Sequence, residues 1–83
     1  MNTKIERTQT GLRIEKRLLK VLKGLAESLD MSLGDLIEGI VLHSFENKSP
    51  FSDETLAKIQ QLKAVYELDW TAGDSHKFKE TEE

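Results

Sequence analysis

The sequence predicts a mainly helical homodimer, with one short strand and two consecutive helices in each chain and an added C-terminal helix. Three observations predict this fold class. Residues 8–14 alternate like a strand, no second strand candidate follows, and the second helical pattern is apolar nearly all round. A lone strand exposes a row of unpaired N–H and C=O groups. We therefore expect it to pair with the same strand of a second copy, as an intermolecular antiparallel β-ribbon.

The strand candidate has two faces of different chemistry. Thr10, Leu12 and Ile14 fall on one face, and Gln9, Gly11 and Arg13 on the other. The first face is suited to a core. The second would be the outer face of the ribbon, and glutamine and arginine are residue types that hydrogen-bond to base edges.

The first helix is expected from Lys16 to about Leu29, because its apolar residues recur at helical spacing. They are Leu18, Leu22, Leu25 and Leu29, with Leu19 and Ala26 widening the stripe. Lys16, Lys20, Lys23 and Glu27 fall on the opposite side. A charged face of this kind is usually a solvated surface.

The second helix is expected from Leu33 to about Glu46, after a short turn at Asp30 and Met31. Ser32 and Asp35 have the spacing of a capping box, with Asp in place of the usual Glu or Gln. Its apolar residues are Leu33, Leu36, Ile37, Ile40, Val41, Leu42 and Phe45. Because they cover far more than one stripe, this helix should be buried on several sides, and a twofold dimer would provide the burial.

Strand, helix and helix at this spacing resemble the ribbon-helix-helix (MetJ/Arc-type) DNA-binding family, over about residues 8–46. The resemblance implies that Gln9, Gly11 and Arg13 read bases in the major groove. Gly11 departs from the usual pattern, because it has no side chain to contact a base. It would either let the backbone approach closely or mark a bulge, and a bulge would turn Thr8 and Thr10 outward instead.

The same resemblance implies a phosphate clamp at the start of the second helix, near the N–H groups of Ser32, Leu33 and Gly34. Lys16 and Arg17 are candidates for further phosphate contacts. The expected dimer core consists of Leu12, Ile14, Leu18, Leu22, Leu25, Leu36, Ile37, Ile40 and Val41. A helix-turn-helix is the nearest competing motif, but its second helix needs a polar face for the groove and this one is apolar nearly all round.

The charge of the chain is divided along its length. The formal net charge is −3, but residues 1–23 contain seven bases and two acids, a charge of +5, and the remainder carries −8. The basic part coincides with the proposed ribbon and the start of the first helix, where phosphates would lie.

The domain organisation follows from these elements. We expect a flexible basic N-terminal arm (1–7), a DNA-binding and dimerisation domain (8–46), a linker (47–51), a C-terminal helix and aromatic extension (52–78) and a disordered acidic tail (79–83). Ser52 is the expected N-cap of the added helix, which should run to about Leu68 with an apolar stripe. The extension would either support its own dimer or dock a partner protein or a neighbouring dimer.

Other chemistry is sparse in the sequence. There is no cysteine, the two histidines, His43 and His76, are far apart, and no glycine-rich phosphate loop is present. We therefore expect no metal, no cofactor and no enzymatic activity. Asp74, Ser75 and His76 are catalytic residue types, but a contiguous triplet near a chain end offers no oriented base.

The chain is expected to bind double-stranded DNA sequence-specifically as a homodimer, and several dimers could assemble on the DNA. We expect it to act in the cytoplasm as a transcriptional repressor. No apolar run approaches membrane-spanning length. Two alternatives stay open. One is an antitoxin whose C-terminal segment binds a toxin, and the other is a dimeric adaptor that binds no DNA.

Overall fold

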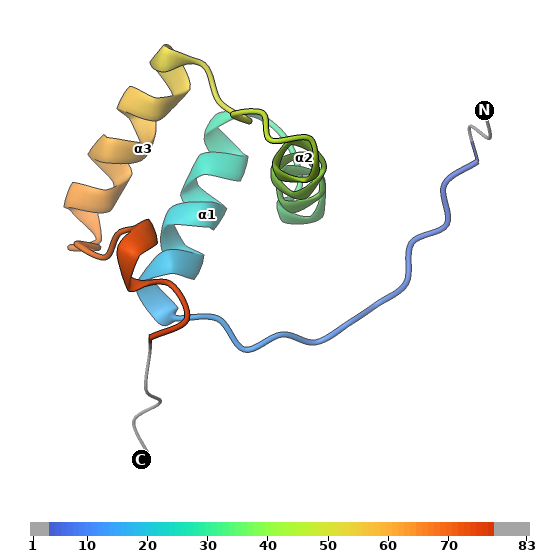
Figure 1. Cartoon of the computed structure of the whole chain (residues 1–83), viewed down its shortest axis with the longest axis horizontal. Helices are drawn as coiled ribbons and strands as arrows, with labels where there is room; N and C mark the ends of the chain where they lie inside the picture. The colour runs from blue at the N-terminus through green and yellow to red at the C-terminus, as the bar shows by residue number, and fades with distance from the viewer. Residues whose placement is uncertain (1–3, 78–83) are drawn as a thin grey trace.

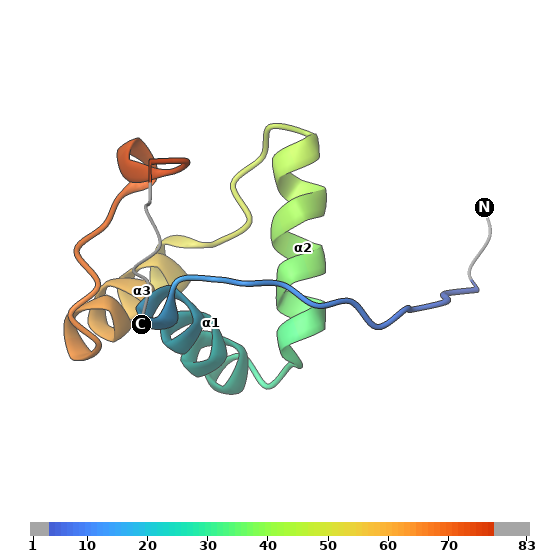
Figure 2. The same cartoon turned by 90° about the horizontal axis from the view of Figure 1, so that it is seen from below.

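Three helices follow one another in residues 4–77, which are the residues that the computed structural model describes (Figure 1). They are α1 (Lys16–Ser28), α2 (Leu33–Phe45) and α3 (Asp53–Val65), followed by the 3-10 turn η1 (Ala72–Asp74). Helix α1 packs against both α2 and α3, and Figure 2 shows α2 running across the direction of the other two. The described chain is thus an all-helical unit with an extended N-terminal segment.

The predicted strand at 8–14 is not present, so the expected ribbon-helix-helix fold class is wrong for the described chain. Residues 4–15 form an extended segment without strand or helix that leaves the helices and runs outward (Figure 1). Alternation of side chains indicates an extended backbone, and the backbone is extended. A strand also needs a hydrogen-bonded neighbour, and no other described segment lies beside this one as a strand.

The helix boundaries come close to the predicted ones, because local capping sets them. Ser32 Oγ accepts a hydrogen bond from Asp35 N–H at 3.1 Å, and Ser52 Oγ accepts one from Thr55 N–H at 3.2 Å. Both predicted N-caps are confirmed. Glu15 caps α1, through a hydrogen bond from Leu18 N–H to Glu15 Oε1 at 2.9 Å.

The helices end in the same way at their C-termini, although none of the ends carries a glycine. Asp30, Asn47 and Glu67 each adopt a left-handed conformation, with φ of 57°, 57° and 56°. The N–H of the residue that follows each of them then reaches back five residues, for example from Met31 to the Ala26 carbonyl at 3.0 Å. This arrangement satisfies carbonyls that the end of a helix leaves open.

The core lies where α1 meets α2 and α3. Leu25, Ala26 and Leu36 are buried at its centre. Partly buried around them are Leu22, Leu29, Ile40, Phe51, Ile59 and Leu62. Gly24 lets α3 approach α1 closely, since a Cβ at this position would lie only 3.1 Å from Leu62 Cδ2.

Helix α2 is much less covered than its sequence predicts. Leu36 is its one buried residue within the chain, while Leu42 is 62% exposed and Phe45 is 80% exposed. The prediction of burial on several sides is therefore not met by this chain alone. Helix α1 packs against one side of α2, and much of the rest of α2 is exposed in the described chain.

The C-terminal extension packs onto its own chain. Leu68 is buried, and it lies beside the Arg17 and Lys63 contacts that hold the segment after α3. Asp74 Oδ2 accepts hydrogen bonds from the Thr71 N–H at 2.8 Å and from the Thr71 hydroxyl at 3.3 Å, which shapes η1. Phe78 and the predicted tail 79–83 lie outside the described residues, as do residues 1–3 of the predicted arm.

Candidate nucleic-acid interface

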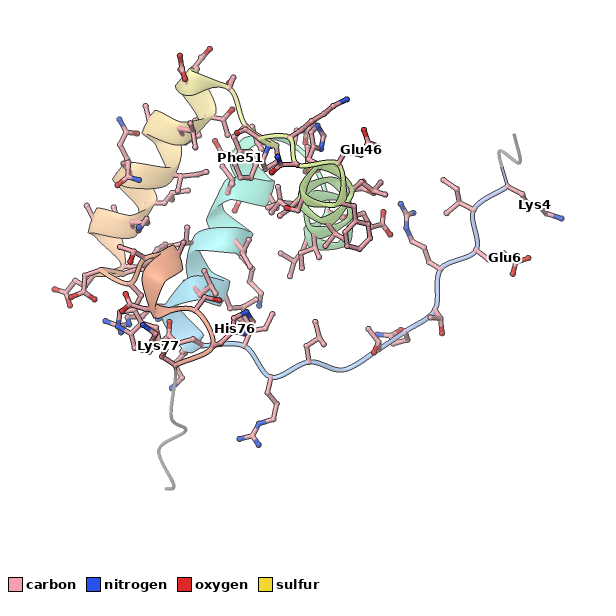
Figure 3. All side chains as sticks on the ribbon, viewed as in Figure 1. Lys4, Glu6, Glu46, Phe51, His76 and Lys77 are labelled. Carbon is pink, nitrogen blue, oxygen red and sulfur yellow. The ribbon has the colours of Figure 1, made fainter. Side chains whose placement is uncertain are left out.

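The candidate interface begins with the extended N-terminal segment, residues 4–15, here named the basic arm. Residues 4–13 are all exposed. Figure 3 shows Lys4 and Glu6 near the outer end of the arm, away from the helices. All the predicted base-reading residues lie on this arm, in both predicted registers: Thr8, Gln9, Thr10, Gly11 and Arg13.

Gly11 has open space around it. No heavy atom lies within 4 Å of the position that its Cβ would occupy, and its φ is not in the left-handed region. The structure thus gives Gly11 neither a close backbone neighbour nor the conformation that a glycine bulge requires.

The predicted dimer core is divided by the structure into buried and exposed residues. Leu25 and Leu36 are buried within the chain, and Ile14, Leu22, Ile37 and Ile40 are half-buried. Leu12 is 69% exposed on the arm, and Leu18 and Val41 are each 38% exposed on their helices. Within one chain, some of these apolar side chains are buried and others are exposed, and the dimer core stays a prediction.

The lysine face of α1 continues directly from the arm. It consists of Lys16, Lys20 and Lys23, all exposed. Among the described residues none of the three forms an ion pair with a carboxylate, and Lys20 Nζ lies 5.9 Å from the centre of the Tyr66 ring. Three ammonium groups on one helix side are suited to contacts with phosphates.

Arg17, a predicted phosphate contact, makes several contacts within its own chain. Its Nη1 donates to the Glu67 carbonyl at 2.9 Å, its guanidinium lies 5.3 Å from the centre of the Trp70 ring, and its Nε lies 3.5 Å from Glu15 Oε2. These contacts hold the C-terminal extension on the start of α1. Sequence spacing gave no signal for them, because 50 residues separate Arg17 from Glu67.

Arg7 fastens the arm to α2, a contact that the sequence did not predict. Its Nη2 lies 2.8 Å from Asp35 Oδ1 and 2.9 Å from Glu38 Oε1, and its Nε lies 3.0 Å from Glu38 Oε2. The hydrogen bond from Arg7 to Glu38 raises the pKa of Arg7, and the negative charges of Glu38 and Asp35 act in the same direction. The same bond from Arg7 holds the pKa of Glu38 below its usual range. All three side chains are half exposed, so water screens the attraction.

The predicted phosphate clamp at Ser32, Leu33 and Gly34 is the N-terminus of α2, as expected. Ser32 Oγ already satisfies one N–H group there, that of Asp35. The Asp35 carboxylate and the Arg7 guanidinium meet beside it. An anion at this end would therefore meet both a favourable helix dipole and a nearby carboxylate.

His43 and Asp74 each have a hydrogen-bond partner nearby in their own segment. No group of three or more metal-ligating side chains occurs in the part of the chain that the structure describes. His43 Nδ1 lies 2.7 Å from the Gly39 carbonyl, so that nitrogen carries the proton. Asp74 serves as a cap for Thr71 rather than as a partner for His76.

Comparison of the chain with protein-family models, with curated proteins and with solved structures finds no match. The resemblance to the ribbon-helix-helix family therefore stays a prediction from the sequence. None of the helices in residues 4–77 has the length and hydropathy needed to cross a membrane.

Proposed function

We propose that this chain is a double-stranded DNA-binding protein that acts in the cytoplasm as a homodimeric transcriptional repressor. The observation that carries this proposal is the continuity of the exposed basic arm with the lysine face of α1. Together they gather the positive charge of a chain whose remaining residues are strongly acidic. Segregated positive charge is the electrostatic footprint of a nucleic-acid-binding surface.

The arm contacts DNA in its extended form, without a β-ribbon. An extended, exposed segment can lie in a groove, where Arg13 can donate two hydrogen bonds to guanine and Gln9 can pair with adenine. Lys16, Lys20 and Lys23 contact the phosphates beside the groove and set the orientation. Arg7 exchanges its two carboxylate partners for phosphate oxygens when the arm engages.

The adaptor alternative differs from this proposal in one measurable property, the binding of duplex DNA. The antitoxin alternative requires the C-terminal extension to be available for a toxin. Since Arg17, Lys63 and the buried Leu68 tie that extension to its own chain, no specific observation favours it.

The test is fluorescence anisotropy on a 30-base-pair duplex enriched from a random library and on a scrambled duplex, each over a range of salt. We expect affinity for both duplexes to fall steeply with salt. Arg13→Ala should cost about 1–3 kcal/mol on the enriched duplex and little on the scrambled one. Lys16→Ala should weaken both alike and make the salt slope shallower by about one unit.

Lys48→Ala is the matched control, because it removes one exposed positive charge that pairs with Glu46 outside the arm and the lysine face. It should leave affinity and salt slope nearly unchanged. Absence of salt-dependent binding to any duplex would contradict the DNA-binding proposal and favour the adaptor.

A further inference from the structure

The charge of the chain changes sign between the basic arm and α2. Residues 24–47 contain five acids and no lysine or arginine, and three of these acids lie on α2 or at its end. Asp35 and Glu38 are three positions apart, so their side chains are neighbours on the helix surface. Two negative charges at this spacing repel each other. This part of α2 therefore attracts a positive group from elsewhere in the chain.

Arg7 of the basic arm supplies that positive group. Its Nη2 lies 2.8 Å from Asp35 Oδ1 and 2.9 Å from Glu38 Oε1, and its Nε lies 3.0 Å from Glu38 Oε2. Two N–H groups on one carboxylate are the bidentate geometry that arginine forms with carboxylates and with phosphates. We name this contact of Arg7 with Asp35 and Glu38 the latch. It joins the extended arm to a helix 28 residues further along the chain.

The latch occupies the same donors that a DNA phosphate would use. A phosphate presents anionic oxygens to a guanidinium much as a carboxylate does. The Nε and Nη2 of Arg7 already donate to the two carboxylates. Arg7 can therefore make this bidentate contact with α2 or with a phosphate, but not with both at once.

The latch is weak enough for a duplex to open it. The side chains of Arg7, Asp35 and Glu38 are 58%, 49% and 47% exposed, so water screens their attraction. An ion pair of this exposure changes an equilibrium constant by about 1.4-fold to fivefold. A duplex that presents several phosphates to the arm and the lysine face gains far more than this. The latch would therefore lower the affinity for DNA without preventing binding.

We propose that the latch is an autoinhibitory contact, in which Asp35 and Glu38 hold the basic arm on α2 until the phosphates of a duplex displace them from Arg7. The inference rests on the proposed function and adds a regulation of the same surface. Because only chains with an open latch bind fully, the affinity for every duplex is reduced by the same factor. The latch sets how tightly the chain binds and leaves the choice between sequences to the base-reading residues.

Paramagnetic relaxation enhancement tests the latch without DNA. The chain has no cysteine, so Glu6→Cys supplies one exposed site on the arm for a nitroxide label. We expect the label to broaden the amide signals of α2 around Glu38. Arg7→Gln in the same labelled chain should reduce this broadening several-fold, because the arm then leaves α2. Equal broadening with and without the arginine would overturn the inference.

Fluorescence anisotropy with the enriched and the scrambled duplex tests the competition with phosphate. Glu38→Gln should raise the affinity for both duplexes by about twofold to fivefold and leave their ratio unchanged. In an Arg7→Gln background the same substitution should change the affinity much less, because no latch remains to open. Glu54→Gln is the matched control, since it removes one exposed carboxylate in the first turn of α3. It should change the affinity much less than Glu38→Gln, and circular dichroism should stay helical for every variant.

The possible outcomes separate this inference from the DNA-binding proposal. No gain from Glu38→Gln would overturn the latch, and so would a gain that persists in the Arg7→Gln background, because it would reflect only general repulsion between the carboxylate and DNA. Duplex binding without broadening that depends on Arg7 would support the DNA-binding proposal and overturn only this inference. If no variant binds any duplex although the broadening depends on Arg7, the DNA-binding proposal and the release by phosphate both fail, and the contact in the free chain stands.

Discussion

Arg17 and its neighbour Lys16 have opposite surroundings, although both are bases at the start of α1. Arg17 is tied to the Glu67 carbonyl and lies over Trp70, while Lys16 is exposed on the lysine face. A planar guanidinium can stack on an aromatic ring and donate in its own plane at once, which an ammonium cannot do. Arg17 is thus placed to stabilise the fold, whereas Lys16 stays exposed on the lysine face.

This difference gives a prediction for substitutions by glutamine. Arg17→Gln should lower the free energy of unfolding by about 1–2 kcal/mol, because it removes a hydrogen bond and a cation–π contact. Lys16→Gln should change the free energy of unfolding by less than about 0.5 kcal/mol. Urea denaturation measures both. In a double-mutant cycle with Trp70→Leu, Arg17→Gln should show a coupling of about 0.5–1 kcal/mol, and zero coupling would mean that the ring contact contributes nothing.

Glu15 gives a pH dependence whose sign follows from its contacts. Partial burial alone would raise the pKa of Glu15, but hydrogen bonds from Leu18 and Arg17 N–H groups and the Arg17 charge outweigh it and lower the pKa. The carboxylate therefore holds fewer protons in the folded chain than in the unfolded one. Its stabilisation is complete above the usual carboxyl pKa of about 4.3 and is lost as the pH falls below it.

Replacing Glu15 by glutamine should flatten the acid side of the stability curve. Glutamine keeps an oxygen that can accept from Leu18 N–H, so the cap survives without its charge. Urea denaturation between pH 7 and pH 3 should then show a smaller loss than in the wild-type chain. Glu6→Gln, on the outer part of the basic arm, controls for the general loss of one negative charge. An unchanged curve for Glu15→Gln would contradict this assignment.

At the scale of elements, the packing of α1 on α3 depends on a glycine, and α2 contains a glycine without that constraint. A Cβ at Gly24 would lie 3.1 Å from Leu62 Cδ2, whereas no heavy atom lies within 4 Å of the Cβ position at Gly39. Alanine in a helix interior is favoured over glycine by about 1 kcal/mol. Alanine should therefore favour the helical backbone equally at both positions, but only at Gly24 would its Cβ press against another helix.

Gly39→Ala should raise the free energy of unfolding by about 0.5–1 kcal/mol. Gly24→Ala should gain less than this or lose stability, because the Leu62 side chain must move by a few tenths of an ångström. In a Leu62→Ala background, Gly24→Ala should recover the full helix gain. Urea denaturation of Gly39→Ala, Gly24→Ala, Leu62→Ala and the double variant Gly24→Ala/Leu62→Ala measures these free energies. An equal gain in the free energy of unfolding for both single glycine variants would show that α1 and α3 are not in close contact at Gly24.

At the scale of the whole molecule, positive charge gathers near the N-terminal end of the described chain, and large apolar side chains are exposed both there, at Ile5 and Leu12, and on α2. The bases are concentrated in the arm and the start of α1, and Leu42 and Phe45 are exposed on α2. Arg7 is where the two meet, because it joins the basic arm to the carboxylates of α2.

How much of this could be predicted depends on the distance along the chain over which each interaction acts. The sequence by itself determined the three helices, because the N-caps at Ser32 and Ser52 and the apolar periodicities act over three or four residues. It also determined that positive charge gathers in residues 1–23. These properties hold whatever the chain packs against.

Only the tertiary structure decided the rest. A strand requires a hydrogen-bonded neighbour, so alternation at 8–14 could not show that the described chain provides none. The face of α2 that is covered depends on where α1 and Phe51 lie. Asp35 is 28 residues from Arg7, and Glu67 is 50 residues from Arg17. Contacts at such separations are set by the packing of helices in space, which no local pattern of residues records.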